Sequence, residues 1–260
     1  MSILTPVRGT QVIYSINPVA KLSAAFLLSF VLILTIDWLS ATVALVLESV
    51  LFAWAGLSRR QFFVRTLPIW FAAPAAALTT LLYGQPSGQT YVSLGFLHVT
   101  DGSISLAIAT ALRVLAIGLP AVVLFVTIDP TDLADGLAQV WHLPSRFVLG
   151  ALAGLRLVGL FIDDWRSLEL ARRARGVGDR GRIRRLFSQA FALLVLSIRR
   201  GSKLATAMEA RAFGGDTPRT WARQSRFGWR ETVLIGIGAV IAATATTAAV
   251  LFGTWNFVAG

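Results

Sequence analysis

The sequence predicts an all-α fold, namely a polytopic helical membrane protein with about five spanning helices and long cytoplasmic helices. The first reason is composition, because 55% of the residues are hydrophobic and 14% are charged, whereas soluble domains carry about 25% charged residues. A mean hydropathy of +0.69 agrees with this class. The second reason is a set of apolar runs of spanning length. The third is the uneven distribution of arginine between those runs.

Spanning helices are expected wherever about 20 predominantly apolar residues follow one another. The first begins at Asn17-Pro18, because asparagine is a favoured N-cap and proline is favoured at the first helical position. Lys21 would extend its ammonium group to the inner membrane surface. The expected spans are 19–36, 40–57, 66–83, 104–128 and 232–252.

The orientation of these spans follows from the distribution of basic residues, which are enriched in cytoplasmic loops. Residues 84–103 contain no lysine or arginine, whereas residues 129–230 contain most of the arginines of the chain. We therefore expect a cytoplasmic N-terminus, an external loop at 84–103 and an external C-terminus. The chain divides into N-terminal transmembrane helices (1–128), a cytoplasmic or interfacial helical region (129–230) and a C-terminal transmembrane helix (231–260).

The first part of the region 129–230 contains two helix starts. Asp129-Pro130 opens a short helix, because proline suits the first turn and an acidic side chain is favourable there. Leu143-Pro144 precedes a long helix that is apolar at its start and polar toward its end near residue 174. Gly176 and Gly178 follow and are typical of a helix C-cap.

A second long helix is expected at about 182–212, before Gly214, Gly215 and Pro218. Its apolar centre, 187–198, is short for a membrane span. We expect a membrane-surface or protein-covered helix here. The alternative is a re-entrant segment or an additional spanning pair.

Both long helices end in the same motif, Ala-x-x-Ala-Arg-small-apolar-Gly, at 171–178 and 207–214. The motif arginines, Arg175 and Arg211, are 36 positions apart. A guanidinium group offers five donors in a fixed fork to a carboxylate. The alternative is an arginine that only stabilises its own helix dipole. Because the motif occurs twice, we favour docking onto a partner protein, with small flanking residues that keep each helix end slim: Ala174, Gly176, Ala210 and Ala212.

Glu48 and Arg113 are the charged residues within the apolar runs that call for an explanation. Charged groups inside a membrane are costly and are usually paired or functional. They could pair with each other or face a partner subunit, and we favour a structural pair.

Several functions are excluded or disfavoured. The chain has no cysteine and two histidines far apart in sequence, so we expect neither a metal site nor a cofactor. It contains no G-x-x-x-x-G-K-[ST] motif, so any ATP hydrolysis belongs to partner subunits. The net charge of +11 reflects cytoplasmic loops rather than nucleic-acid binding. A stand-alone transporter or channel remains the alternative, and it would need polar groups converging at mid-membrane.

The chain resembles the transmembrane T component of energy-coupling factor (ECF) transporters, a family related to the cobalt-transport membrane subunit. The likeness covers nearly the whole chain. It rests on four features: Asn17-Pro18-x-x-Lys21-Leu22 before the first span, Asp129-Pro130-Thr131-Asp132-Leu133, Leu143-Pro144 before an apolar helix, and the two Ala-Arg motifs.

The resemblance implies a non-catalytic multi-pass scaffold in the cell membrane of a prokaryote. It would couple two ATP-binding cassette ATPase subunits to one substrate-binding membrane S component during vitamin or metal-ion import. Arg175 and Arg211 would each engage a groove in one ATPase through the two long coupling helices. The second motif has Ala212 where glycine is usual, and a left-handed alanine costs about 1 kcal/mol. That helix could therefore continue to Gly214 before it ends.

Overall fold

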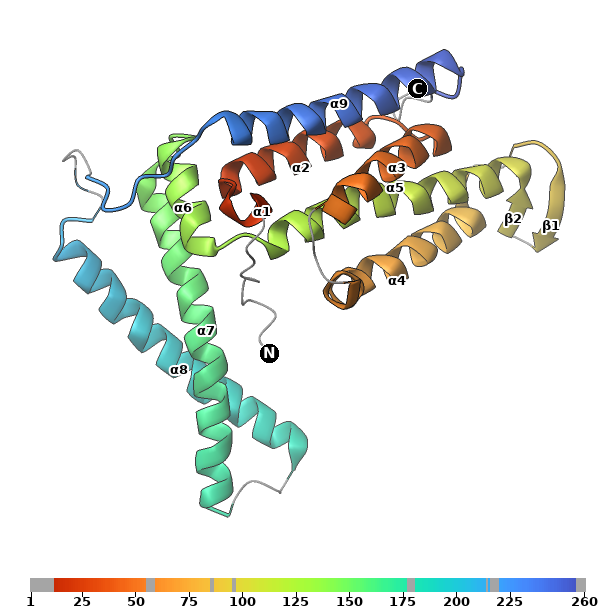
Figure 1. The fold of residues 1–260 in the computed structure, drawn as a ribbon. Coiled ribbons are helices and arrows are strands. Elements are labelled where there is room, and N and C mark those ends of the chain that lie inside the picture. The colour runs from red at the N-terminus through yellow and green to blue at the C-terminus, as the bar shows by residue number, and fades with distance from the viewer. Residues whose placement is uncertain are drawn as a thin grey trace. The chain divides into compact units, whose positions relative to one another are not determined.

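The computed structural model describes residues 12–54, 59–84, 87–94, 97–176, 181–213, 215 and 220–255 (Figure 1). It confirms the predicted all-α class, with one small β-hairpin, β1 and β2, in the expected external loop. The elements in chain order are α1 (Val12–Ser15), α2 (Pro18–Ile33), α3 (Trp38–Trp54), α4 (Arg59–Tyr83), β1 (Thr90–Leu94), β2 (Leu97–Thr100), α5 (Asp101–Val126), α6 (Pro130–Gln139), α7 (Ser145–Ala174), α8 (Arg182–Glu209) and α9 (Trp229–Leu251).

The chain forms two compact units. The bundle unit comprises Met1–Gly136 and Ser225–Gly260, so it contains α1 to α5, the hairpin and α9. The helix-pair unit comprises Leu137–Gln224 and contains α7 and α8. Helix α6 begins in the bundle unit and ends in the helix-pair unit, so the chain passes between the units within α6 and again just before Ser225.

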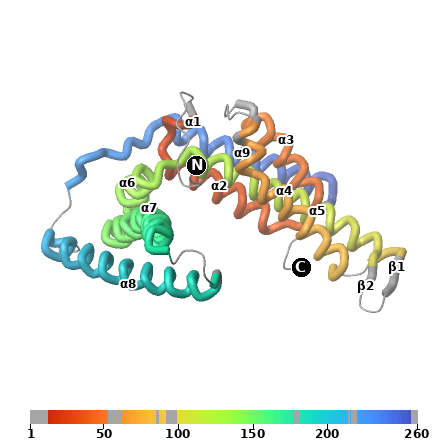
Figure 2. Tube along the Cα trace, turned by 90° about the horizontal axis from the view of Figure 1, so that it is seen from below, coloured from red at the N-terminus to blue at the C-terminus, as the bar shows by residue number. Residues whose placement is uncertain are grey.

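The core of the bundle unit lies between α2, α3, α5 and α9, and α4 packs along α5 (Figure 2). Leu28 and Leu32 of α2 meet Ile241 of α9 in this core, next to alanines of α3, α5 and α9. Small residues let helices approach closely within a membrane. Gly238 of α9 is an example, because a Cβ at this position would lie 3.3 Å from the carbonyl oxygen of Ala24.

Three of the five expected spans are helices long and apolar enough to cross a membrane, namely α4, α5 and α9. The first two expected spans correspond to shorter apolar helices, α2 with 16 residues and α3 with 17. Helix α7 also has the length and composition of a span, although we expected it in a cytoplasmic or interfacial region. The reason is that the first part of α7 contains an apolar stretch of spanning length before the charged end of the helix begins.

The predicted helix starts at Asn17-Pro18 and Asp129-Pro130 are confirmed. The Asn17 side chain caps α2 by accepting a hydrogen bond from the N–H of Val19 at 3.0 Å, and Pro18 is the first helical residue. The Asp129 carboxylate likewise accepts a hydrogen bond from the N–H of Thr131 at 2.8 Å.

The expectation that Lys21 extends to the membrane surface is wrong. Its side chain is buried, and its Nζ donates hydrogen bonds to the Thr127 carbonyl oxygen at 3.2 Å and to Thr127 Oγ1 at 2.9 Å. The end of α5 packs against the first turn of α2, which covers the ammonium group and supplies its acceptors.

The expected pairing of Glu48 with Arg113 is also wrong. Arg113 donates through Nη2 to the carbonyl oxygen of Ile33, the last residue of α2. A helix leaves its last carbonyl groups without intrahelical partners, so this contact satisfies one of them. Glu48 is 1% exposed, and neither carboxyl oxygen has a hydrogen-bond partner among the described residues.

The burial of Glu48 leads to a stability prediction. An unsatisfied buried polar group costs about 1–3 kcal/mol, so Glu48→Leu should raise the melting temperature, by about 2–4 °C for each kcal/mol regained. Glu48→Gln keeps two polar atoms at the same place and should show none of this gain. Thermal unfolding of the purified chain measures both. A lower melting temperature for Glu48→Leu would mean that the carboxyl group has a stabilising partner.

Candidate functional site

The two Ala-Arg motifs lie at the ends of α7 and α8 in the helix-pair unit. The helices cross, and the short connection between them places the start of α8 beside the end of α7 (Figures 1 and 2). At 1.5 Å per residue, the 28 residues of α8 carry the chain roughly 40 Å from that connection. Arg175 and Arg211 therefore lie at separate ends of the crossed pair.

The first motif ends α7 as predicted. The last helical residue is Ala174, and Arg175 follows it. Gly176 adopts a left-handed conformation with φ of +70°, and its N–H donates to the carbonyl oxygen of Arg173 at 3.0 Å. A glycine in this conformation is the usual way to end a helix. Gly178, the other glycine expected here, lies outside the described residues.

The second motif ends α8 earlier than we expected. The helix stops at Glu209, and Ala212 itself adopts the left-handed conformation, with φ of +54°. The N–H of Ala212 donates to the Glu209 carbonyl oxygen at 2.9 Å, and the N–H of Phe213 donates to the Met208 carbonyl oxygen at 3.0 Å. These two bonds form a Schellman motif. The expectation of a helix that continues to Gly214 is therefore wrong, and Gly214 lies outside the described residues.

The two arginines consequently occupy equivalent places, because each directly precedes the left-handed residue of its helix end. Both are exposed, as are the small flanking residues Ala174, Gly176, Ala210 and Ala212. In this geometry the local backbone bonds satisfy carbonyl groups of the last turns. The guanidinium groups are not needed for that purpose.

Neighbouring arginines of α7 behave differently. Arg172 donates to Ser188 Oγ at 2.7 Å, and Arg173 forms an ion pair with Glu169 at 2.6 Å. The side chains of Arg175 and Arg211 form no hydrogen bond or ion pair with another side chain in the part of the chain that the structure describes. They are therefore available to an external acceptor, as a docking role requires.

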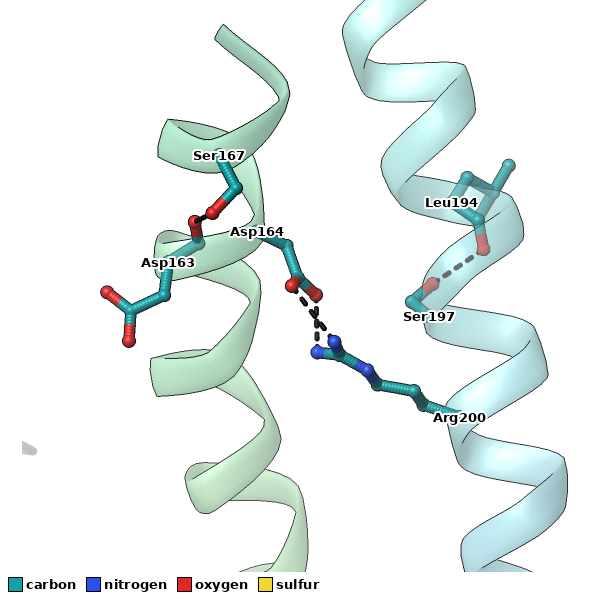
Figure 3. Close-up of polar contacts among 6 residues, drawn as sticks. All are labelled: Asp163, Asp164, Ser167, Leu194, Ser197 and Arg200. Atoms are coloured by element: carbon teal, nitrogen blue, oxygen red, sulfur yellow. Dashed lines mark hydrogen bonds and ion pairs between the residues drawn. The ribbon is translucent and has the colours of Figure 1, made fainter. Parts of the chain in front are cut away.

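A third feature of the unit, which the sequence did not reveal to us, holds the crossing together. Arg200 of α8 forms a bidentate ion pair with Asp164 of α7 (Figure 3), with Nη2 2.9 Å from Oδ1 and a second contact between Nη1 and Oδ2. The pair is partly buried, whereas adjacent Asp163 is exposed and lies 3.8 Å from Arg166. In the sequence, the adjacent acidic residues Asp163 and Asp164 in the middle of the helix were the available signal for an ion pair, but they did not indicate which of the two faces α8.

The helix pair also exposes large apolar side chains. An open apolar groove is lined by Trp165 of α7 and by Ile183, Leu186, Phe187 and Ala190 of α8. Further along α8, Phe191, Leu194 and Ile198 are at least half exposed. An exposed apolar surface of this extent is typical of a membrane or protein contact.

The ion pair at the crossing generates a prediction. Asp164→Ala or Arg200→Ala should destabilise the helix pair by roughly 1–3 kcal/mol, because each change leaves a partly buried charge without its partner. Asp163→Ala is the matched control and should change stability by less than about 0.5 kcal/mol.

A double-mutant cycle measured by thermal unfolding completes the test. It compares the single variants Asp164→Arg and Arg200→Asp with the double variant in which the two residues are exchanged. The exchanged pair should recover part of the stability lost in the single variants. A coupling energy near zero would show that the crossing depends on apolar packing alone.

Comparison with known proteins identifies related chains. The model of the CbiQ family, described as "Cobalt transport protein", matches residues 9–221. The "Energy-coupling factor transporter transmembrane protein EcfT" of Bacillus selenitireducens is 29% identical over 253 residues, covering 91% of this chain and 92% of its own. The protein of the same name from Listeria innocua is 26% identical over 242 residues, covering 88% and 91%.

A third protein of this name, from Limosilactobacillus fermentum, is 28% identical over 213 residues and covers 76% of this chain and 78% of its own. These likenesses extend across both the bundle unit and the helix-pair unit. Since the family model covers most of the chain, the chain belongs to the CbiQ family, alongside the EcfT-type transmembrane components of energy-coupling factor transporters.

Proposed function

We propose that this chain is the non-catalytic coupling subunit of an energy-coupling factor transporter. In this role it binds two ATP-binding cassette ATPase subunits and one substrate-binding S component. The observation that carries the proposal is the pair of equivalent helix ends, each with an exposed arginine that has no side-chain partner among the described residues. The names of the relatives support the same role.

Each arginine would bind one ATPase. A guanidinium fork pairs well with a carboxylate in a groove, and small neighbouring residues leave room for the groove walls. Because the two ends are roughly 40 Å apart along α8, one ATPase at each end is a reasonable arrangement. Binding and hydrolysis of ATP by the partners would then move the ends of α7 and α8.

The S component would contact the apolar groove that Trp165 lines and the exposed apolar side chains of α8, such as Phe187 and Phe191. A change in the crossing of α7 and α8 would then tilt or release it. The ion pair between Asp164 and Arg200 lies at the crossing that this motion would use. The transported compound would be bound by the S component.

We also propose a multi-pass location in a prokaryotic cell membrane with a cytoplasmic N-terminus. The arginine-rich region 129–230 would lie on the cytoplasmic side or at the membrane interface, and the loop 84–103 would be external. A cysteine introduced at Thr90, which is exposed in β1, should react with an impermeant reagent in intact cells. A cysteine at Ser202 in α8 should react only after permeabilisation. Labelling of Ser202→Cys in intact cells would refute this orientation.

The docking role predicts the effect of arginine variants. Arg175→Ala or Arg211→Ala should weaken binding to the ATPase subunits by roughly 2–5 kcal/mol, since the partner carboxylate loses its counter-charge. This corresponds to more than a tenfold rise in Kd. Co-purification and titration with the ATPases measure it. Arg175→Lys should also weaken binding, because lysine retains the charge but lacks the fork.

The controls for these variants come from the same unit. Arg184→Ala removes an exposed arginine of α8 that belongs to neither motif and should bind normally. Ala212→Gly should also retain binding, because glycine fits the left-handed conformation better than alanine. Equal damage from Arg184→Ala would favour diffuse positive charge over docking. Transport by the purified chain alone in liposomes would favour the stand-alone transporter.

A further inference from the structure

Both chain connections between the units leave the bundle unit beside the first turn of α2. The first passes through α6 after Gly136, and the second ends at Ser225. A Cβ on Gly136 would lie 2.5 Å from Val19 Cγ2, 3.0 Å from Asn17 Oδ1 and 3.5 Å from Ser225 Oγ. The two connections therefore meet at α2, and all of these residues belong to the bundle unit.

Asn17 holds the second connection. Its Nδ2 donates hydrogen bonds to Ser225 Oγ at 2.7 Å and to the Arg226 carbonyl oxygen at 2.9 Å. Its N–H donates to Glu231 Oε1 at 3.1 Å, and Glu231 Oε2 also accepts from the N–H of Gly228 at 2.9 Å. Asn17 and Glu231 are both buried. Capping α2 requires only Asn17 Oδ1, so the Nδ2 bonds are additional to helix capping.

One turn further along α2, Lys21 holds the end of α5, from which the chain continues through α6 into the first connection. Lys21 is 1% exposed, and its ammonium group bonds both oxygens of Thr127, the residue that directly follows α5. Asp132 in the first turn of α6 is close enough to act on Lys21 through its charge. A buried ammonium group is costly unless it is paired and hydrogen-bonded. A shorter or apolar side chain could not make this connection.

We propose that Asn17 and Lys21 act as a clamp that holds both connections at one place on α2, so that motion of the helix-pair unit reaches the bundle unit through this place. The clamp is defined as Asn17 and Lys21 with their acceptors Thr127, Ser225 and Arg226. The proposal rests on the proposed coupling function, and it makes Asn17 and Lys21 positioning residues for that coupling.

Three variants separate the clamp from ordinary helix stability. Asn17→Asp keeps an acceptor for the N–H of Val19 but replaces the Nδ2 donor with an oxygen. Lys21→Met keeps the apolar stem but loses the donor. Ser225→Ala removes an acceptor while leaving the cap of α2 intact. Ser23→Ala is the matched control, because Ser23 Oγ bonds the Val19 carbonyl oxygen within α2 at 2.8 Å.

The first readout is hydrogen–deuterium exchange of each variant without nucleotide. Asn17→Asp and Ser225→Ala should speed exchange at 225–232, and Lys21→Met should speed it at 127–133. We expect about a tenfold increase, which corresponds to about 1.4 kcal/mol of local stability. Ser23→Ala should change neither segment. Unchanged exchange in all three clamp variants would overturn the clamp.

The second readout uses the complex with the co-purified ATPase subunits and compares the nucleotide-free state with the ATP-bound state. In the wild type, ATP should alter exchange in α7 and α8 and also in α2 and α5. In the clamp variants the change in α7 and α8 should remain. The change in α2 and α5 should fall at least about fivefold, the lower end of typical coupling between sites.

The outcomes distinguish the two proposals. If the wild-type chain binds no ATPase, the proposed function fails and the coupling role of the clamp fails with it. If the variants bind ATPase and still pass the full ATP-dependent change to α2 and α5, the clamp is overturned while the proposed function stands. A merely structural role of Asn17 or Lys21 would accelerate local exchange without this selective loss.

Discussion

Close approach of helices lined with alanine is the constraint on which the bundle unit depends. Lipid is as apolar as the side chains of the helices, so association in a membrane depends on packing rather than on the removal of apolar surface from water. Alanines of α2, α3, α5 and α9 accordingly fill the interior at nearly zero exposure: Ala20, Ala41, Ala44, Ala116, Ala242, Ala245 and Ala249. Several larger apolar side chains of these helices, such as Phe26 and Val46, are more than half exposed, although Leu28, Leu32 and Ile241 are buried. This distribution suits a bundle that is surrounded by lipid.

The polar contacts among the described residues of this bundle lie mainly at helix ends. Arg113 satisfies the end of α2, and Asn17 and Glu231 organise the starts of α2 and α9. Lys21 joins the end of α5 to α2. Each contact places a charged or polar group where a helix terminus offers unsatisfied backbone partners. Glu48 differs, because it lies in the middle of α3 with no bonded partner among the described residues.

The helix-pair unit is built differently, because its described residues form long exposed helices with a bidentate ion pair at the crossing and little buried apolar surface. Its two ends nevertheless have the same backbone geometry, although one uses Gly176 and the other Ala212. The backbone bonds after Glu209 hold alanine in a conformation that it adopts only at a cost. The equivalence of Arg175 and Arg211 is therefore a property of the folded helix ends and not only of the repeated motif.

The sequence by itself determined the features that depend on neighbours along the chain. Apolar runs of spanning length predicted the helices, and Asn17-Pro18, Asp129-Pro130 and Gly176 predicted where three helices begin or end, because caps act within one turn. Contacts between distant residues were decided by the tertiary structure. Only packing showed that Lys21 is buried against Thr127 and that Asp164 rather than Asp163 meets Arg200. Packing likewise separated Glu48 from Arg113. The position of a side chain at a helix interface depends on how the two helices are rotated against each other, and no local sequence pattern specifies this rotation.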